Sequence, residues 1–419
     1  MNILVIGGGG REHAIIKKIK ENEKVDKIYA LPGNAGMDGD ATCVDISATD
    51  IPAIANFAIE NNIDYAIVSP DDPLVLGLVD VLEEKGIPCF GPKKNAAIIE
   101  GSKVFSKNLM KKYGIPTASY ETFSDPKDAV KYIETAKFPT VIKADGLALG
   151  KGVIIANTKT EALDAINSIM TEKKFGESGN NIVIEEFLEG VEVSLLAFTD
   201  GKTLIPMVSA MDHKLSGDGD TGTNTGGMGS IAPNPYYTEE ISKICMKDIF
   251  LPTMNAMNSE GRKFKGCLYF GLMLTAQGPK VIEYNCRFGD PETQAILPLL
   301  KSDLLTIMQA VTAETLSETE VVFEDKSACC VVMASSGYPI SYEKGYEIQC
   351  PENIKPNIYF AGGIRKGGKL LTNSGRVLGV TAIGASLKEA VTQAYELVHQ
   401  IHFDNEYYRT DIGAKALKK

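Results

Sequence analysis

The segment from Lys143 to Gly152 reads KADGLALGKG and follows a run of β-branched residues at 140–142. Glycines in a loop between two strands let the backbone approach phosphate oxygens, and Lys143 and Lys151 supply positive charge. The pattern is not a P-loop, in which the lysine precedes Ser or Thr at the start of a helix. The segment therefore predicts a phosphate-binding loop between two strands. The alternative is a plain hairpin with two solvated lysines.

A second group of polar side chains lies on the strand expected from Lys280 onward. Glu283, Asn285 and Arg287 are spaced two residues apart, so all three face one side of that strand. A carboxylate and an amide oxygen on one face suit Mg²⁺ or Mn²⁺, which take few protein ligands and add nucleotide phosphates. Arg287 can bind a carboxylate or a phosphate through two hydrogen bonds. A buried Glu–Arg pair is the alternative, but it leaves the asparagine between them unexplained.

A weaker signal comes from the strand expected at 182–186, which runs into a mixed polar and apolar stretch. Backbone groups there could read an adenine edge, and Glu192 could accept a ribose hydroxyl. Strands followed by acidic residues are common, so this stretch alone predicts little.

The turn Gly7–Gly10 follows a strand and opens a helix, where backbone N–H groups and the helix dipole favour an anion. A dinucleotide site is disfavoured, because Glu12 occupies the third glycine position of G-x-G-x-x-G and the next strand ends at Pro32 without an acid. A phosphate-bearing ligand other than NAD is the better interpretation, and a tight structural turn is the alternative. His13 alone is more typical of a helix face than of a catalyst.

Composition narrows the possible functions. The chain has 419 residues, which suggests two to four domains, and its 44% hydrophobic and 23% charged content is typical of a soluble globular protein. The formal charge of −11 argues against nucleic-acid binding, and no apolar run suits a membrane span. The first residues carry no basic leader, so we expect a cytoplasmic protein. Eight cysteines without a Cys-x-x-Cys pair argue against a zinc site.

The elements that must position these groups can be read from the pattern. Alternating strands and helices over residues 1–100 predict a parallel sheet, with ligands at the carboxyl ends of its strands and one helix over Pro73–Lys85. A bridging helix ending at YGIP (113–116) leads into strand, helix, strand, turn, strand, helix, strand, and a long loop is expected at 212–230. We expect an α/β protein, α+β in parts. Its predicted regions are 1–102, 103–190 with a lid at about 120–188, 191–323 and 324–419.

In this order the pieces resemble the ATP-grasp enzymes, and from about residue 3 to about residue 413 the chain is similar to the phosphoribosylamine–glycine ligase family. The resemblance is carried by GGREHA (9–14), PGNAG (32–36), KADGLA (143–148), DHK (212–214), NTGGMG (224–229) and EYNCRFGDPETQ (283–294). It implies an ATP-grasp core with an N-terminal parallel-sheet domain and a small C-terminal α+β domain. It also implies that glycine is joined to 5-phosphoribosylamine at the expense of ATP, through a glycyl phosphate, in purine biosynthesis.

Residue roles follow from the resemblance. It implies contacts to ATP at Lys103, Lys143, Gly150, Lys151, Gly152, Glu185, Glu186, Leu188 and Glu192. It implies Mg²⁺ or Mn²⁺ at Glu283 and Asn285, and it implies that Arg287, Asp212 and Lys214 orient glycine and its acyl phosphate. Substrate contacts are implied at Gly9, Gly10, Asn34, Gly36, Asp72, Asn224 and Gly289, while His213 is either a loop anchor or a catalyst. The expected partners are the two small-molecule substrates, without nucleic acid or membrane, in a monomer or weak homodimer.

The chain departs from the family pattern in places. Ser69-Pro70-Asp71 stands for Gly-Pro-Glu, and the segment 359–363 lacks the His and Thr of the usual Phe-His-Ala-Gly-Thr. The second difference leaves open whether the C-terminal region takes part in substrate binding. The alternatives are another ATP-grasp ligase or carboxylase and a non-catalytic nucleotide-binding regulator. The 212–230 loop and the 287–294 run favour the glycine ligase over the first. The phosphate lysines and the metal pair argue against the second.

Overall fold

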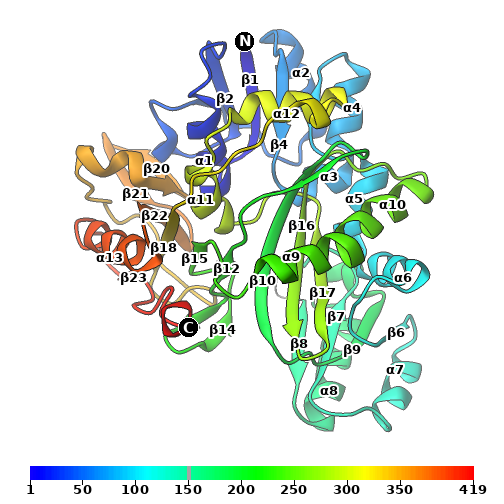
Figure 1. The fold of residues 1–419 in the computed structure, drawn as a ribbon. Helices are drawn as coiled ribbons and strands as arrows, with labels where there is room; N and C mark the ends of the chain where they lie inside the picture. The colour runs from blue at the N-terminus through cyan, green and yellow to red at the C-terminus, as the bar shows by residue number, and fades with distance from the viewer. Residues whose placement is uncertain (149–151) are drawn as a thin grey trace.

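The computed structural model describes residues 1–148 and 152–419. Its N-terminal region is the predicted parallel sheet, with strand order β3-β2-β1-β4-β5 and helices packed against it (Figure 1). Strand β1 (Asn2–Gly7) is central because its apolar residues from Ile3 to Ile6 are fully buried, each contributing roughly 1.5–3 kcal/mol. The direction of strand order reverses between β1 and β4 (Tyr65–Val68), and ligands of such sheets bind outside the carboxyl ends of the strands at this point. The other elements are β2 (Lys27–Pro32), β3 (Thr42–Cys43), β5 (Cys89–Phe90), α1 (Gly10–Ile19) and α2 (Ile51–Glu60).

The helix predicted over Pro73–Lys85 was wrong as a single element. The structure has α3 (Asp71–Leu76) and α4 (Leu78–Glu84), separated at Gly77. Gly77 has a φ of +96°, a left-handed conformation that ends a helix and that glycine adopts without a steric penalty.

Two helices link the N-terminal sheet to the lid. These are α5 (Lys94–Gly101) and α6 (Lys103–Tyr113). Ser102 caps α6 by accepting a hydrogen bond from the Phe105 amide at 3.0 Å, and Gly114, with a φ of +68°, ends it as the YGIP sequence predicts.

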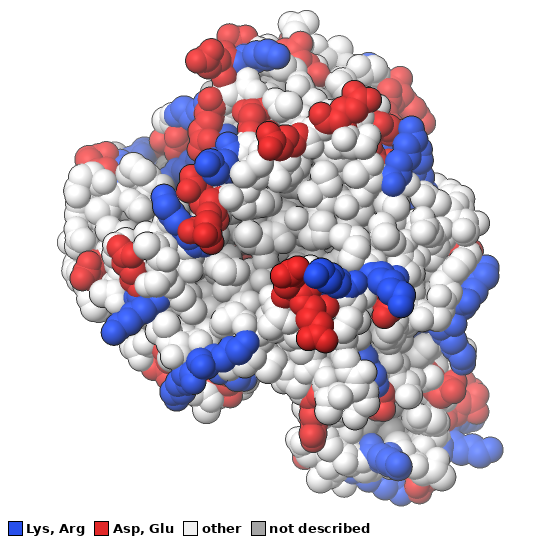
Figure 2. All heavy atoms as spheres, viewed as in Figure 1, with Lys and Arg blue, Asp and Glu red and all other residues white. Residues whose placement is uncertain are grey.

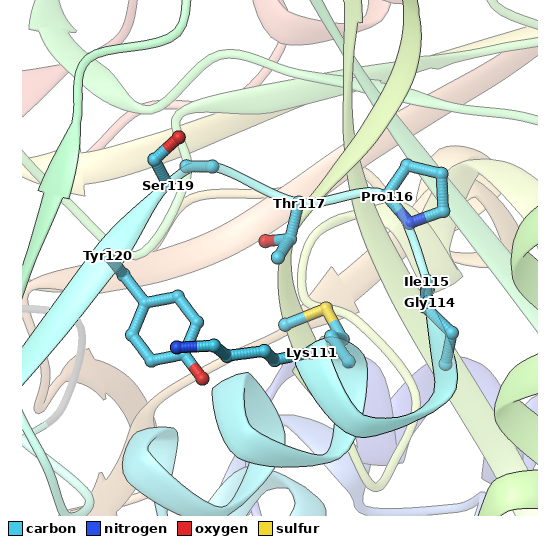
Figure 3. Close-up of a pocket in the computed structure, with 9 residues that line it drawn as sticks. Lys111, Gly114, Ile115, Pro116, Thr117, Ser119 and Tyr120 are labelled. Carbon is cyan, nitrogen blue, oxygen red and sulfur yellow. The ribbon is translucent and has the colours of Figure 1, made fainter.

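The hinge that follows α6 is fixed to the central sheet. The Val281 amide donates to the carbonyl oxygen of Pro116 at 2.8 Å, and the Thr117 hydroxyl donates to the Val281 carbonyl at 2.7 Å. An open hollow lies beside this hinge, with Lys111 extended along the ring of Tyr120 (Figure 3). The hinge therefore couples the base of the lid directly to strand β17 (Gly278–Asn285).

The lid is an antiparallel sheet with the order β6-β9-β7-β8, and its elements follow the predicted order. Its buried apolar side chains form a cluster separate from those of the other regions, so the lid packs as a unit of its own. The elements are β6 (Tyr120–Phe123), α7 (Pro126–Ile133), β7 (Thr140–Ala144), β8 (Val153–Ala156), α8 (Lys159–Ile166) and β9 (Ile182–Glu186).

The central region is a second antiparallel sheet, ordered β11-β10-β16-β17, with helices α9 and α10 along it (Figure 1). One π-helical turn at Met246–Phe250 joins α9 to α10. The elements are β10 (Val191–Thr199), β11 (Leu204–Pro206), α9 (Glu239–Cys245), α10 (Leu251–Ser259), β16 (Gly266–Thr275), α11 (Glu292–Ile296) and α12 (Leu304–Ala313).

The C-terminal sheet has the order β12-β15-β18-β22-β19, with β23 (Glu406–Tyr407) paired to β18. The 212–230 segment, expected as a loop, instead begins at the last residue of β12, ends within β15 and contains a short hairpin of β13 and β14. The segment is therefore held by backbone ladders from the C-terminal region. The elements are β12 (Met211–Asp212), β13 (Leu215–Gly217), β14 (Thr221–Asn224), β15 (Gly229–Ala232), β18 (Ser327–Ser335), β19 (Ile358–Phe360), β20 (Gly363–Lys366), β21 (Lys369–Thr372), β22 (Arg376–Gly384) and α13 (Leu387–Val398).

Two surface features follow from the described residues. On the face drawn in Figure 2, acidic and basic side chains are interspersed and do not gather into one basic surface. Among the residues that the structure describes, no helix has both the length and the apolar character needed to cross a bilayer.

Candidate active site

Strand β17 presents one polar face, as its sequence predicts. Glu283, Asn285 and Arg287 are partly exposed, whereas the intervening Tyr284 and Cys286 are buried. The Glu283 side chain is 30% exposed, so its carboxylate is accessible to a ligand.

Positive charge surrounds Glu283. Lys214 Nζ lies 3.9 Å from its carboxylate. Burial raises the pKa of Glu283, but nearby lysines lower it more, so its pKa is held below the ordinary value. The lysines responsible are Lys214, Lys143 and Lys103, which come from the 212–230 segment, the lid and α6. Three separate elements thus bring cations to one carboxylate.

Lys103 is positioned by Asp145, a residue that the sequence analysis did not single out. The carboxylate of Asp145 accepts a hydrogen bond from the Val104 amide at 2.8 Å, and its carbonyl accepts one from the Lys103 amide at 2.9 Å. Lys103 Nζ donates to the carbonyl of Gly146 at 3.1 Å. The start of α6 is therefore joined to the loop that follows β7.

A buried ion triad joins α6, β9 and β7. The carboxylate of Glu185 pairs with the ammonium groups of both Lys107 and Lys143, and all three side chains are almost completely covered. The Thr140 hydroxyl donates to the Glu185 carbonyl at 2.9 Å. Because its carboxylate and carbonyl are both engaged, Glu185 is suited to holding the two lysines. Glu185 therefore supports Lys107 and Lys143, and its contact with ATP stays a prediction.

The other residues assigned to ATP are spread along the edge between lid and central sheet. Glu186 accepts hydrogen bonds from Lys280 at 3.1 Å and from the Ser119 amide at 3.0 Å, and Leu188 is partly exposed. Glu192 pairs with Lys214. The Gly152 carbonyl accepts from the Ala144 amide at 2.8 Å, whereas Gly150 and Lys151 lie outside the described residues.

The residues predicted to bind metal fit a cation that completes its shell with phosphates. Asn285 Nδ2 donates to Glu100 at 3.0 Å, which leaves Oδ1 as the end of the amide directed away from Glu100. Glu283 and Asn285 thus offer a carboxylate and an amide oxygen, a donor set that suits Mg²⁺ or Mn²⁺. Among the described residues, no group of three or more His, Cys, Asp or Glu side chains is arranged to hold a metal ion, so phosphate oxygens would supply the remaining ligands.

Asp212 lies in a buried acidic corner. Its Oδ1 atom is buried without a hydrogen-bond partner, and a side chain at Gly227 would meet this oxygen at 2.7 Å. Burial raises the pKa of Asp212 well above its ordinary value, and the nearby carboxylate of Glu292 adds to the shift. Glu292 accepts hydrogen bonds from Ser194 at 2.9 Å and Tyr269 at 3.0 Å.

His213 anchors the 212–230 segment. Its Nδ1 lies 3.2 Å from the Gly229 carbonyl, and its Nε2 accepts from the Gly413 amide at 3.1 Å. Both ring nitrogens are engaged with backbone groups, which favours the anchor over the catalyst. Burial lowers the pKa of His213, which keeps the ring neutral.

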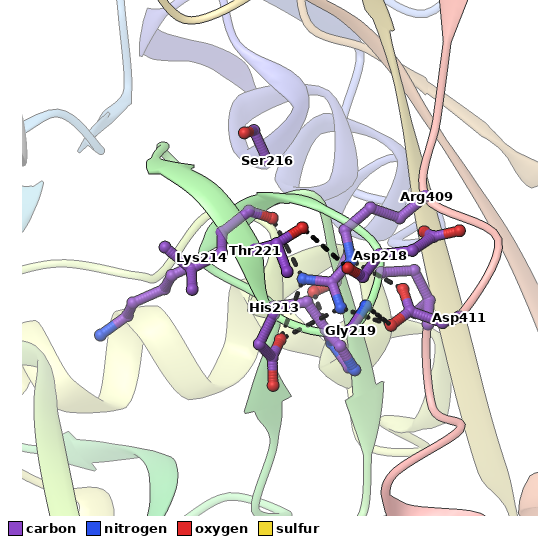
Figure 4. A network of polar contacts seen from close by, with 12 residues as sticks. His213, Lys214, Ser216, Asp218, Gly219, Thr221, Arg409 and Asp411 are labelled. Carbon is purple, nitrogen blue, oxygen red and sulfur yellow. Dashed lines mark hydrogen bonds and ion pairs between the residues drawn. The ribbon is translucent and has the colours of Figure 1, made fainter.

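The hairpin after His213 is fixed by the end of the chain (Figure 4). Arg409 donates to Asp220 at 3.1 Å and to the Leu215 carbonyl at 3.0 Å, and it pairs with Asp411 at 2.7 Å. Asp411 in turn accepts from the Gly219 amide at 2.8 Å. The hairpin and its predicted substrate residue Asn224 are therefore positioned by residues about 190 positions later in the chain.

The glycine turn after β1 contacts the C-terminal region. Asn34 Nδ2 donates to the carbonyls of Gly8 at 2.8 Å and Phe360 at 3.0 Å, and a side chain at Gly36 would collide with Phe360 at 2.2 Å. The 359–363 segment, whose part in substrate binding the sequence leaves open, thus packs directly on the predicted substrate residues.

The remaining substrate residues lie around the same junction. A side chain at Gly9 would lie 3.5 Å from Asp290 Oδ2, one at Gly10 would meet Gln294 at 2.6 Å, and one at Gly289 would meet Glu292 at 2.4 Å. Asp72 is an exposed residue of α3. Partial desolvation of its carboxylate, together with the charge of Asp71, raises its pKa. Its neighbour Asp71 lies 3.9 Å from Arg287.

Sequence reasoning missed Glu100, Lys107 and Arg376, and it gave no role to Glu292, which lies in the 283–294 run. Glu100, Lys107 and Arg376 share no local motif with the residues they contact, so no spacing in the sequence signals their positions.

Comparison with known proteins identifies the family. Models of phosphoribosylglycinamide synthetase match the chain in three consecutive parts: the N domain at residues 1–100, the ATP-grasp (A) domain at 101–293 and the C domain at 328–415. A phosphoribosylamine–glycine ligase of Caldanaerobacter subterraneus is 48% identical over 415 residues, which is 99% of this chain and 100% of the relative. The chain belongs to the phosphoribosylglycinamide synthetase family. The predicted family is confirmed.

Solved structures confirm the predicted fold. The phosphoribosylamine–glycine ligase of Thermotoga maritima is 35% identical, with a TM-score of 0.87 over 98% of this chain and 100% of that one. A biotin carboxylase domain from Hydrogenobacter thermophilus is 14% identical, with a TM-score of 0.76 over 97% of this chain and 91% of that one. This second likeness shows that the chain shares its fold with that biotin carboxylase domain.

Proposed function

We propose that this chain joins glycine to 5-phosphoribosylamine, giving glycinamide ribonucleotide, ADP and phosphate, in de novo purine biosynthesis. The observation that carries the proposal is the convergence of Lys103, Lys143 and Lys214 on Glu283 in a chain that matches the ligase family over its full length. Phosphoryl transfer needs positioning and charge neutralisation more than a strong base, which suits this arrangement.

The proposed reaction has two steps. A carboxylate oxygen of glycine attacks the γ-phosphorus of ATP, the bond from this phosphorus to the bridging oxygen breaks, and ADP leaves from a glycyl phosphate. The amine nitrogen of phosphoribosylamine then attacks the carbonyl carbon, the carbon–oxygen bond breaks, and phosphate leaves as the nitrogen loses a proton. Lys103 and Lys143 bind the nucleotide phosphates, while Arg287, Lys214 and Asp212 orient glycine and its acyl phosphate.

ATP-grasp enzymes use ATP together with a divalent metal. We assign the metal to Glu283 and Asn285 and expect either Mg²⁺ or Mn²⁺ to serve, since both accept oxygen ligands. When bound, the cation neutralises charge on the nucleotide phosphates. We further propose that the protein is a cytoplasmic monomer or weak homodimer, a location that the family's place in purine biosynthesis supports.

The decisive experiment is ADP release from ATP and Mg²⁺ by the purified chain, with glycine and freshly made phosphoribosylamine added separately and together. We expect full turnover only with both substrates. ADP release with bicarbonate instead would favour a carboxylase, and ATP binding without turnover would favour a regulator.

The metal assignment has its own variant. Glu283→Ala should abolish turnover while the protein stays folded, whereas Glu239→Ala, which changes a glutamate exposed on α9, should leave turnover unchanged. Near-normal activity of Glu283→Ala at saturating metal would place the metal elsewhere.

A further inference from the structure

We propose that Glu100, the carboxylate near the end of α5, is a positioning residue that turns the amide of Asn285 so that its oxygen faces the metal. This inference rests on the proposed function, because it concerns the metal that the ligation requires.

The carboxylate of Glu100 is completely engaged by the end of β17. Its Oε1 accepts hydrogen bonds from Asn285 Nδ2 at 3.0 Å and from Arg287 Nη2 at 2.8 Å, and its Oε2 accepts one from the Cys286 amide at 2.7 Å. The Glu100 side chain is only 6% exposed, compared with 30% for Glu283. Glu100 therefore cannot serve as an open ligand itself, but it contacts the groups that can.

The direction of the Asn285 amide decides whether this residue can bind a cation. Only the oxygen of a side-chain amide is a ligand, because its nitrogen carries two hydrogens and is a donor. A carboxylate accepts hydrogen bonds and donates none, so Glu100 selects the orientation in which the nitrogen faces it. The amide oxygen then has the opposite orientation. Outer residues of this kind orient metal ligands, and their loss typically weakens metal binding about 10- to 100-fold.

The third contact makes this selection rigid. The Cys286 amide belongs to the backbone between Asn285 and Arg287, so its bond to Oε2 fixes the carboxylate relative to the strand. Arg287 has a second carboxylate nearby, because Asp71 lies 3.9 Å from Nη2. The amide nitrogen of Asn285 donates to Glu100. Loss of Glu100 should therefore affect the amide of Asn285 more than the charge of Arg287.

A buried carboxylate with three donors could also act only as a structural brace, and the chain offers a matched control for that possibility. Asp200 is 1% exposed and likewise accepts three hydrogen bonds, in this case all from backbone amides: Lys202 at 2.8 Å, Thr203 at 2.7 Å and Leu316 at 3.2 Å. It follows β10 and touches none of the proposed metal residues. Asp200→Asn places an NH₂ group against buried backbone donors. Glu100→Gln does the same, because its NH₂ group meets either Asn285 and Arg287 at the Oε1 position or the Cys286 amide at the Oε2 position, and in both cases the contact with β17 is disturbed.

The experiment measures Mn²⁺ binding by electron paramagnetic resonance in the presence of a non-hydrolysable ATP analogue, alongside ADP release and thermal unfolding. Glu100→Gln should weaken Mn²⁺ binding about 10- to 100-fold and raise the metal concentration needed for half-maximal turnover by a similar factor. Asp200→Asn should lower the unfolding temperature but leave Mn²⁺ binding within about twofold of wild type. Equal Mn²⁺ binding by Glu100→Gln and wild type would overturn the proposal.

A double variant separates orientation from packing. In Glu100→Gln with Asn285→Asp, the new amide at 100 can donate to the new carboxylate at 285, which restores the bond with its polarity reversed. The double variant should bind Mn²⁺ more tightly than the product of the two single effects predicts. Independent, multiplying effects would contradict the proposal.

The experiment also covers a variant that does not fold and a wild-type protein that binds no metal. If Glu100→Gln does not fold, Glu100→Asp replaces it, because that change keeps the charge but shortens the reach to the three donors and should weaken Mn²⁺ binding in the same direction. If wild type itself neither binds Mn²⁺ nor releases ADP, the proposed function fails. Wild-type turnover combined with unchanged metal binding in the variants refutes the role of Glu100 alone.

Discussion

Arg376 Nη2 lies 3.2 Å from the carboxylate of Asp290, and its Nη1 donates to the carbonyls of Asp290 at 3.1 Å and Gly226 at 2.6 Å. Arg376 begins β22 in the C-terminal sheet, Asp290 follows the polar face of β17, and Gly226 lies beyond the β13–β14 hairpin. One side chain therefore joins the C-terminal region to two predicted parts of the active site. Burial lowers the pKa of Arg376, but Asp290 outweighs this effect, and the guanidinium stays charged.

Replacing Arg376 with methionine should impair catalysis, because it removes the contacts that hold Gly226 and Asp290 together. Without the guanidinium, the Gly226 turn is no longer held against Asp290. The largely buried Asp290 carboxylate loses its ion pair and keeps the hydrogen bond from Gln294, which destabilises the fold by about 2 kcal/mol. Displacement of substrate residues by about 1 Å can lower kcat/KM about 100-fold. We expect a loss of that order in steady-state assays that vary glycine and phosphoribosylamine.

Arg365→Met is the matched control, because Arg365 forms an exposed pair with Asp38 in the same region. An exposed pair contributes under about 1 kcal/mol, so kcat/KM should stay near that of wild type. Equal effects of the two variants would show that Arg376 has no special role.

The fold was largely predictable, because its signals are local. The buried run at β1, the glycine at 114 and the alternation along β17 each depend on neighbouring residues, and the structure agrees with all three. The exception at Gly77 has an equally local cause: a glycine inside a helical pattern adopted a positive φ and divided the helix.

The contacts that position the site were not predictable, because they join distant segments. Glu100 meets Asn285 across 185 positions, and Arg409 meets Asp220 across 189. The 212–230 segment lacks the apolar alternation of a strand. Strand β15 nevertheless forms at its end because it pairs with the buried strand β18, and β12 in turn pairs with β15. Tertiary pairing decided these structures, and a single sequence carries no signal for it.

Lys107 should support ATP binding without being the residue that contacts phosphate. The triad of Lys107, Glu185 and Lys143 carries one excess positive charge, and Lys107→Met would leave a neutral Glu185–Lys143 pair. A unit charge about 10 Å from a phosphate is worth on the order of 1–2 kcal/mol at an effective dielectric constant near 20. The KM for ATP should therefore rise roughly tenfold in an ADP-release assay. Lys111→Met, which changes an exposed lysine on the same helix, should leave that KM unchanged.

His13 should make the junction between α1 and β19 sensitive to acid. Its Nδ1 accepts the Phe360 amide at 2.9 Å and its Nε2 lies 3.1 Å from Asp40, so protonation of Nδ1 would break the first bond. Burial lowers the pKa of His13 from 6.5 to about 4. Between these pH values the imidazole of His13 binds a proton in the unfolded chain but not in the folded chain. The contribution of neutral His13 to the free energy of unfolding is therefore fully present above pH 6.5 and is lost as the pH falls toward 4.

On going from pH 7.5 to pH 5, the free energy of unfolding should fall by about 2 kcal/mol because of His13. Hydrogen exchange of the Phe360 amide measures this loss of stability at the junction itself. In wild type, the protection of this amide against exchange should fall between pH 7.5 and pH 5. His13→Gln can still donate to Asp40 but does not titrate, so its protection should vary much less with pH. A similar pH dependence in both proteins would contradict the assignment.

Arg409 should determine whether the β13–β14 hairpin is ordered. Its side chain is 1% exposed and reaches Asp220, Asp411 and the Leu215 carbonyl, whereas residues 218–224 at the hairpin tip are exposed. Arg409→Met removes this anchor but leaves two carboxylates, of Asp220 and Asp411, that water can reach. The substitution should therefore destabilise the hairpin more than the fold as a whole. Proteinase K should cleave near residues 218–224 at least about tenfold faster than in wild type, because cleavage follows the population of the open form. Arg262→Met, which changes an arginine that binds the Asn95 carbonyl far from the hairpin, should not increase cleavage there. If Arg409→Met remains resistant but loses activity, the arginine acts in the site by a route other than ordering the hairpin.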